Sequence, residues 1–452
     1  MYTADETVLE NLNFQTIRPF LERHKCEVPR LNKLRDYYLG KHDILARTRE
    51  GNAPNNKIVC NHAKEIVDTS AGYFIGNPVS YNGKNAEMLK EWMRIADIDS
   101  VDMDIAKSEG IYGRAYELVS MSDDDSPTPR SYKLDPRNAF IVYDDTVEHK
   151  KLFGVYYFPQ EDATGNLIGF WVNVYTDAYH LIYHTDGNMC AVKKTSQEPN
   201  PFSEVALIEY SNNEEQQGDF EQVIPLIDAY NLLMSDRVND KEEFVDAILL
   251  LINAVLGDTP EEESATAQAI KKDKILELPS ESDARYLVRT FDEAGVEILK
   301  KALEQDIHKF ANVPCLSDEN FVGNASGVAM EYKLLGLEMI TKIKERYFKA
   351  GLSQRLKLYG TICTIKGGTD DFDVEPVFSR GLPKNLVETA NIITQLQDMV
   401  PAETLLALLP FIKDAKAAAE EMENKNREKA EEQKKAYGIV DNNAPPAGDI
   451  DE

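Results

Sequence analysis

Two pairs of side chains in this sequence have a spacing that could support chemistry. The first is His180 and His184, four residues apart in HLIYH, as in the zinc-binding helix of many metalloproteases. That motif also needs a helix and a Glu directly after the first His, whereas Leu181 follows here within a strand pattern. Residues four apart in a strand share a sheet face but lie too far apart to share one metal ion. We interpret the pair as the solvent face of a strand.

Cys60 and His62 are the second pair, and a thiol beside an imidazole can act as a nucleophile. They lie in IVCNHAKEIVDTSAGYFIG (58–76), where apolar residues recur at helical spacing. Residues two apart on a helix do not face each other. We therefore interpret Cys60 as a buried thiol and His62 as a helix cap.

Acidic side chains gather at 123–125, 261–263 and 370–373. The last group resembles part of a calcium-binding loop but lacks the Gly and the terminal Glu at the required spacing. We interpret the first and last groups as solvated loops and 261–263 as the start of a helix. The sequence contains no Walker A, GxSxG or GxGxxG motif. We predict that the protein is not an enzyme and has no catalytic residue, no cofactor and no metal site.

The composition describes a large acidic protein with a packed core. The 452 residues include 78 Asp and Glu against 50 Lys and Arg, a formal charge of −28, and are 42% apolar. The charge argues against a protein that grips nucleic acid by neutralising phosphates. The five cysteines show no paired spacing, which suits a reducing compartment. We expect no membrane association, since no apolar run is long enough to span a bilayer.

The first half of the chain has a mixed pattern. We expect a helical segment over about 1–40, interrupted at Pro29, and the helix over 58–76. A strand over 79–83, a helix over 88–98 and a strand over 111–121 follow. From there to about 210, short β-branched and aromatic runs between turn signals predict an antiparallel meander of about five strands.

The second half is mainly helical. We expect helices over 219–246, 261–273, 292–312, 326–360, 385–398 and 402–435. Strands are expected at 274–279, 284–289 and 372–383, while AILLLINAV (247–255) fits a strand or a helix. A seam of Val296, Leu299, Leu303, Ile307 and Phe310 should pack on another helix. Within 326–360 we expect Leu335, Met339, Ile343, Phe348, Leu352 and Leu356 to be buried, and Gly336 and Gly351 to permit kinks.

Four long segments resemble one protein family. They are YYLGKHDILAR (37–47), NNKIVCNHAKEIVDTSAGYFIGNPVSY (55–81), IPLIDAYNLLMSDRVNDKEEFVDAIL (224–249) and VPCLSDENFVGNASGVAMEYKLLGLE (313–338). Together they resemble the portal (head-to-tail connector) proteins of tailed bacteriophages, in the branch typical of long-tailed phages of Gram-positive hosts.

The resemblance implies an α+β fold with an α/β wing, a two-helix stem, a small α/β clip, a long kinked helix and a helical crown. It places the wing at 1–218, the stem helices at 219–246 and 291–312, and the clip between them at 247–290. A tunnel loop at 313–327 leads to the long wing helix and a returning strand over 328–384. The crown follows at 385–436, and an acidic tail over 437–452 is expected to be disordered.

The resemblance also implies where DNA and partners would touch the chain. The tunnel loop would face DNA with Ser317, Asp318, Glu319, Asn320, Phe321, Val322, Gly323 and Asn324. The clip would offer Glu261, Glu262, Glu263, Lys271, Lys272 and Lys274 for docking of the terminase. Loops of this length between helices are uncommon, and small or polar residues with glycines let such a loop change shape.

The implied function is a ring of about twelve subunits at one capsid vertex, assembled in the bacterial host cytoplasm and carried in the virion. Double-stranded DNA would pass through it during packaging and ejection. Its partners would be the terminase large subunit, the major capsid and scaffolding proteins, and head-completion or adaptor proteins. Two alternatives stay open: a ring-forming adaptor or minor capsid protein, and a metal-dependent hydrolase that uses the many carboxylates.

Overall fold

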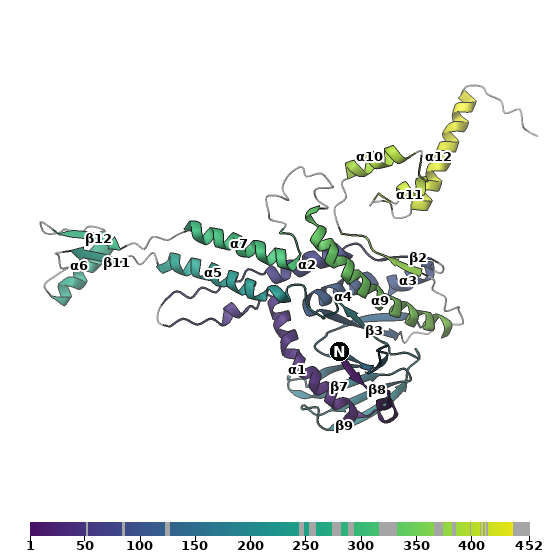
Figure 1. Ribbon diagram of the computed structural model, residues 1–452, viewed down its shortest axis with the longest axis horizontal. Coiled ribbons are helices and arrows are strands. Elements are labelled where there is room, and N and C mark those ends of the chain that lie inside the picture. Colours follow the sequence, from purple (N-terminus) through teal and green to yellow (C-terminus); the bar gives the residue numbers. More distant parts are fainter. Residues whose placement is uncertain are drawn as a thin grey trace, which may run out of the picture. The chain divides into compact units, whose positions relative to one another are not determined.

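A computed structural model gives the fold (Figure 1). It describes residues 1–50, 53–83, 86–122, 127–243, 248–252, 259–273, 282–287, 293–315, 332–365, 374–381, 386–397, 399–406, 408–409, 412 and 415–436. Residues Met1–Gly381 form one compact unit and Leu382–Glu452 a second one. Helices and strands occur in both halves of the first unit, so the fold is α+β as expected.

The larger sheet has six strands in the order β1-β5-β6-β7-β8-β9. Their bounds are β1 Tyr2–Ala4, β5 Ala139–Asp144, β6 Lys151–Glu161, β7 Leu167–Tyr175, β8 Tyr179–Thr185 and β9 Val192–Pro199. The last five are consecutive antiparallel neighbours, which confirms the predicted meander. β1 joins parallel to β5, so the helical prediction for the first residues was wrong. Tyr2 is buried in this core, and a three-residue strand has too little pattern to show itself in the sequence.

Helix α1 (Phe14–Tyr38) packs on this sheet and contains Pro19 and Pro29. The predicted break at Pro29 is therefore wrong. A proline removes one backbone donor from a helix, but packing can outweigh that loss. Here the helix is capped at Asn13 and buries residues on both sides of Pro29, among them Leu21 and Leu31.

A second sheet of three strands, in the order β10-β3-β4, lies at the centre of the helical part. Its strands are β3 Arg114–Met121, β4 Pro129–Leu134 and β10 Leu207–Ser211. The helices around it are α2 His62–Ile75, α3 Ala86–Ile95, α4 Ile98–Tyr112 and α9 Leu335–Ile365, which share an apolar core with it. The predicted strands near 80 and 375 are present and pair with each other, as β2 (Ser80–Gly83) and β13 (Val374–Val377).

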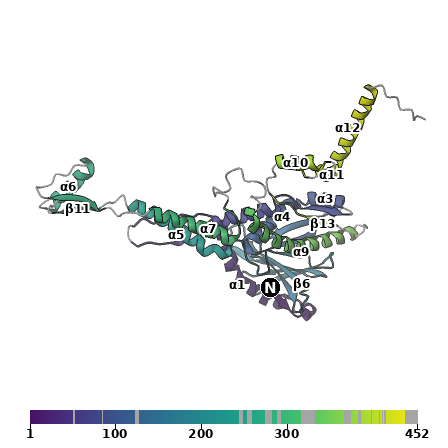
Figure 2. The ribbon, with the colours of Figure 1, turned by 45° about the horizontal axis from the view of Figure 1, so that its top comes forward.

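Helices α5 (Ile224–Glu243) and α7 (Glu293–Ala311) run side by side (Figures 1 and 2). Between them in sequence come β11 (Ile248–Ile252), α6 (Pro260–Asp273) and β12 (Asp283–Leu287), and the two strands pair antiparallel. The ambiguous segment near 250 is thus a strand, and the predicted strand at 274–279 lies outside the described residues. The prediction of a packed apolar seam on α7 is only partly right. Ile307 is buried, while Leu299 and Phe310 are about half exposed.

Helix α9 buries a different face in its first half from the one predicted. Leu337, Thr341 and Lys344 point inward, whereas Leu335, Met339 and Ile343 are 47–58% exposed. Phe348, Leu352 and Leu356 are buried as predicted. Lys344 has partners in the core, Ser70 and Asp219, and Thr341 donates to the Leu337 carbonyl of its own helix, so hydrophobicity alone assigns the wrong face.

The second unit contains α10 (Leu386–Leu396), α11 (Ala402–Leu406) and α12 (Ala415–Ala436). The single helix predicted over 402–435 is therefore two helices. Among the described residues, no helix is long and apolar enough to cross a bilayer.

Candidate functional site

The predicted tunnel-loop residues all fall outside the described residues, in the gap between Cys315 and Tyr332. Lys274 and the acidic groups at 123–125 and 370–373 also lie outside the described residues, in other parts of the chain. Glu261, Glu262 and Glu263 form the exposed first turn of α6, as expected for acids at a helix start. Lys271 and Lys272 lie in the last turn of the same helix.

The two histidines of HLIYH do not form one site. They lie on β8, where His180 contacts the Asn173 amide oxygen at 3.1 Å and stacks on Tyr175, and His184 packs on Trp171.

The interpretation of Cys60 and His62 needs a correction. The helix cap is Asn61, whose side-chain oxygen accepts a hydrogen bond from the Lys64 backbone N–H. Cys60 precedes the helix and is partly exposed. His62 is the first residue of α2, and the apolar pattern of 58–76 begins four residues before the helix does, which is why the sequence placed Cys60 inside it.

Helices α5 and α7 are antiparallel and joined at both ends. Near the C-terminus of α5, Arg237 forms ion pairs with Glu293 and Glu297 in the first turns of α7. At the other end, the Gln222 side-chain amide donates to the Phe310 carbonyl at 2.6 Å. The polypeptide between the two helices, which includes β11, α6 and β12, is thus held on a two-helix support.

A ladder of polar side chains on α5 holds the segment 53–60 against the helix. Asn231, Ser235 and Asn239 recur every four residues on one face and are all fully buried. Their side-chain oxygens accept hydrogen bonds from the backbone N–H groups of Cys60, Ile58 and Asn56 at 2.7–3.0 Å. A segment without regular structure is thereby fixed along the helix by satisfied backbone donors.

Two arginines that precede this segment add charge to the same attachment. Arg47 and Arg49 form ion pairs with Asp236 on α5, at 2.8 and 2.6 Å. Their side chains are 21–25% exposed, so the pairs are partly shielded from solvent. The polypeptide that connects α1 to α2 therefore lies along α5 over much of the connection's described length.

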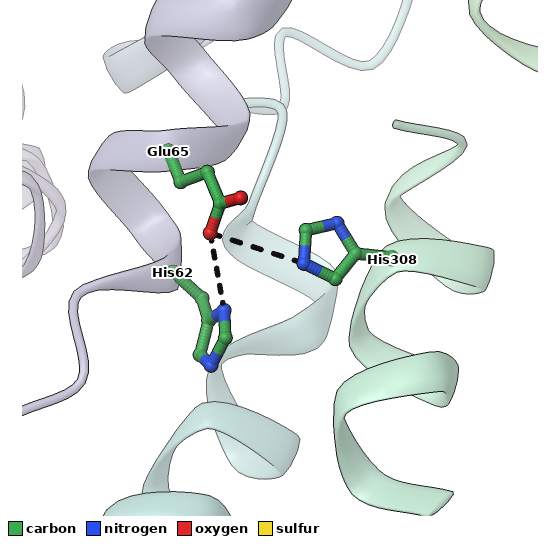
Figure 3. Close-up of side chains that lie close together, drawn as sticks. All are labelled: His62, Glu65 and His308. Atoms are coloured by element: carbon green, nitrogen blue, oxygen red, sulfur yellow. Dashed lines mark ion pairs between the residues drawn. The ribbon is translucent and has the colours of Figure 1, made fainter. Parts of the chain in front are cut away.

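His62, Glu65 and His308 meet where α2 contacts the last turn of α7 (Figure 3). The Glu65 Oε2 lies 3.4 Å from His62 Nδ1 and 3.9 Å from His308 Nε2. Both imidazoles are more than nine-tenths buried, whereas the Glu65 side chain is 41% exposed. The nearby His62 ring lowers the pKa of Glu65, and burial lowers the pKa of His308. Sequence reasoning missed this cluster because His308 is distant in the chain, although His62 and Glu65 have the i, i+3 spacing of helix neighbours.

A buried ionic group connects α9, α4 and the three-stranded sheet. The guanidinium of Arg355 on α9 is fully buried and pairs with Asp102 at 2.6 Å and with Glu117 at 2.8 Å. Glu117 also accepts a hydrogen bond from the Tyr210 hydroxyl at 2.6 Å. Burial raises the pKa of Asp102 to about 6, although Arg355 acts in the opposite direction. All four side chains are buried, and their contacts fix the long helix on the sheet.

A second buried pair lies about three turns earlier on α9. Lys344 Nζ contacts Asp219 Oδ2 at 2.5 Å and Ser70 Oγ at 2.9 Å, which joins α9 to α2 and to the entry of α5. Glu109 is nearby and 1% exposed, and its carboxylate oxygens have no hydrogen-bond partner. Burial raises the pKa of Glu109 well above its usual range. Both groups lie between packed elements and join them.

The order of these elements along the chain points to one class of protein. An α/β body, a helix, a small α/β unit, an antiparallel partner helix and a long helix follow one another in the order that the resemblance to bacteriophage portal proteins implies. The family described as phage portal protein, SPP1 Gp6-like, matches residues 17–435. The chain belongs to this family, whose members are structural components of the phage particle.

Two curated relatives match this chain over most of their length at low sequence identity. The portal protein of Clostridium phage phiCD119 is 24% identical over 442 residues, which cover 90% of this chain and 95% of the relative. The portal protein of Bacillus phage SPP1 is 23% identical over 455 residues, covering 92% and 87%. A chain from the neck of an empty GTA particle, computed with C6 symmetry, aligns with a TM-score of 0.42 at 10% identity, over 76% of this chain and 89% of that one. Both named phages infect Gram-positive hosts, as the sequence resemblance predicted.

Proposed function

We propose that about twelve copies of this chain form a ring at one capsid vertex and that double-stranded DNA passes through its centre during packaging and ejection. The observation that carries the proposal is the antiparallel pair α5 and α7, clamped by Arg237, which connects the α/β body to the small unit of β11, α6 and β12. At 1.5 Å per residue, the 19 residues of α7 extend about 28 Å, enough to form the waist of a channel.

In this assignment α5 and α7 are the stem helices, 247–290 is the clip, and α10, α11 and α12 belong to the crown. The residues 313–327, which continue from the end of α7, are the tunnel loop. The exposed Glu261, Glu262 and Glu263, with Lys271, Lys272 and Lys274, form the surface on which the terminase large subunit docks. Capsid, scaffolding and head-completion proteins would bind elsewhere on the ring, which is assembled in the host cytoplasm and has no catalytic activity of its own.

The proposed ring gives the outward apolar residues a partner. Leu335, Met339 and Ile343 recur every four residues on α9, and Ile298 on α7 is 71% exposed. Apolar rows of this kind mark interaction surfaces in soluble proteins. We assign the row on α9 to contact with a neighbouring copy of the chain.

The formal charge of −28 per chain suits a channel through which DNA passes better than a protein that binds DNA tightly. Repeated about twelve times around a polyanion, it produces a mainly repulsive wall that keeps the duplex from sticking. Salt screens that repulsion beyond about 8–10 Å, so the duplex can still enter. The acidity thus excludes adhesive binding and leaves transit possible.

Electron microscopy of the purified full-length chain tests the proposal. Negative-stain images should show rings with a central hole. Met339→Glu should reduce the fraction of chains in rings, whereas Met88→Glu, the same change at an exposed position of α3, should not. Monomers that bind Mg²⁺ tightly would favour the metal-dependent hydrolase instead. Labelling of the protein at the tail tip rather than at the packaging vertex would favour an adaptor.

A further inference from the structure

We propose that His62, Glu65 and His308 bind one divalent transition-metal ion, with Zn²⁺ as the best match, and that the ion fastens the last turn of α7 to the first turn of α2. The three side chains each offer one ligand atom, and these atoms all lie within 4.8 Å of one another (Figure 3). Two imidazoles and one carboxylate are a ligand set that Zn²⁺ uses in proteins, with a water in the fourth position.

The two distances from Glu65 are close to those of a tetrahedral site, whereas the two imidazole nitrogens lie within 4.8 Å of each other, so the rings must turn toward the ion. Bonds of about 2.0–2.2 Å place tetrahedral ligands about 3.3–3.6 Å apart. Glu65 Oε2 already lies 3.4 Å from His62 Nδ1, and its 3.9 Å separation from His308 Nε2 needs a change of about half an ångström. Rotation of the partly exposed Glu65 side chain can supply that change without moving a helix. The exposed side of Glu65 also gives the ion and its water a path from solvent.

The imidazole nitrogens are the second, independent observation. Neither nitrogen of His62 has a hydrogen-bond partner, and neither does Nε2 of His308, although both rings are more than nine-tenths buried. Buried polar atoms without partners are uncommon in folded proteins because each costs free energy. A metal ion bound by His62 Nδ1 and His308 Nε2 would satisfy two of these three atoms.

The second coordination shell is also in place. His308 Nδ1 lies 3.2 Å from the Val313 carbonyl oxygen, which can only accept a hydrogen bond. That contact puts the proton on Nδ1 and leaves the lone pair of Nε2 directed at Glu65. A ligating histidine that donates its other N–H to a carbonyl or carboxylate is the usual arrangement in metal sites. His62 packs edge-to-face on Tyr230 and on His308, which restrict its ring.

The position of the site suggests what the ion would stabilise. Val313 lies just after α7 and begins the segment assigned above to the tunnel loop. Under that assignment, which the metal site itself does not need, the ion would anchor the base of the tunnel loop to the body. Zinc binding by the chain can be measured whether or not rings form, so failure of this inference leaves the ring proposal untouched.

The test is metal binding by the full-length chain, in a background where the exposed Cys26 and Cys190 are replaced by serine. We expect one Zn²⁺ per chain after dialysis, a rise in the unfolding temperature with Zn²⁺ that a chelator reverses, and at least tenfold weaker binding in His308→Gln and His62→Gln. Glu65→Gln serves if those variants fold poorly, because its partly exposed amide has nearly the shape of the carboxylate. His184→Gln, which removes an imidazole on β8, should bind Zn²⁺ like the parent.

Substitution of Co²⁺ identifies the ligands. Nitrogen and oxygen ligands give visible ligand-field bands without a thiolate charge-transfer band, and the bands should disappear in His308→Gln. A thiolate band would assign the ion to the remaining cysteines and overturn the proposal. Equal Zn²⁺ affinity in the parent, His308→Gln and Glu65→Gln would overturn it as well, as would no binding in the parent.

Discussion

Arg355 on α9 and Glu117 on β3 form an ion pair in which both side chains are completely buried, with Nε 2.8 Å from Oε1. The long helix of a portal subunit is thus attached to its central sheet by a charge that has no access to water. Removing one partner of such a pair leaves the other without compensation, whereas the pair itself adds little net stability.

Glu117→Gln should therefore destabilise the first unit by about 1–3 kcal/mol, less than the cost of a fully unpaired charge because Arg355 keeps Asp102 as a partner. The matched control is Glu109→Gln, which changes another buried glutamate that has no hydrogen-bond partner. Burial already favours the neutral form of Glu109, so this variant should stay within about 1 kcal/mol of the parent. Urea unfolding of both variants measures the difference, and equal losses would contradict the assigned role of Glu117.

Asp102 should make stability depend on pH in a defined window. Its pKa is about 6 in the folded chain against about 3.9 for an ordinary Asp, so between these values the folded state holds a proton that the unfolded state releases. Stability should therefore fall as pH rises from about 4 to about 6, by up to about 1.4 kcal/mol per pH unit from this group. Asp102→Asn removes this pH-dependent contribution to stability, because an amide does not titrate. The difference in unfolding free energy between the parent and Asp102→Asn should change across this window and be constant above it.

Two glycines on α9 should respond to alanine in opposite directions. A Cβ at Gly351 would overlap the ring of Tyr210, which is buried and held by Glu117. Gly351→Ala should cost about 1–3 kcal/mol through overpacking. A Cβ at Gly336 meets nothing closer than 3.6 Å, so Gly336→Ala should stabilise the helix by about 0.5–1 kcal/mol. Thermal unfolding of both variants checks this, and equal behaviour would show that close approach is not the reason for Gly351.

The polar ladder on α5 predicts a local effect. Asn231→Ala or Asn239→Ala leaves a backbone donor of segment 53–60 without its acceptor and should cost about 1–3 kcal/mol. The segment should also detach, so trypsin should cleave faster after Lys57. Leu232→Ala, on the exposed side of the same helix, is the control. An unchanged cleavage rate in the asparagine variants would mean that other contacts hold the segment.

The sequence was sufficient for elements with a long regular pattern. The five-strand meander, the helices α5 and α7, and the strand near 375 all follow from periodicity and turn residues, whereas the pairing of α5 with α7 follows from the family resemblance. It failed where tertiary contacts outweigh local preference. Helix α1 continues through Pro29 because its packed face outweighs one missing donor. Helix α9 turns Lys344 inward because Ser70 and Asp219 bind its ammonium, while Thr341 donates to the Leu337 carbonyl of its own helix.

The cluster on α2 and α7 shows a different limit. His62 and Glu65 carry a local signal, since they are neighbours on one helix face. Nothing near them in the sequence indicates that His308 completes the cluster, because that contact depends on how the two helices pack. The predicted tunnel-loop residues lie outside the described residues, so their role stays a prediction.

Charge reversal tests the tunnel loop. Asp318→Lys with Glu319→Lys should leave rings intact in electron micrographs but make the channel bind DNA, because lysines neutralise phosphates and release counterions. Retention of duplex DNA by purified rings should appear at low salt and fall steeply as salt rises, and packaging in the phage should slow. The control, Asp145→Lys with Glu148→Lys, makes the same charge change in the exposed connection between β5 and β6 and should retain less DNA. Loss of ring assembly, with normal packaging in the surviving particles, would show that 317–324 is an assembly contact and does not face the duplex.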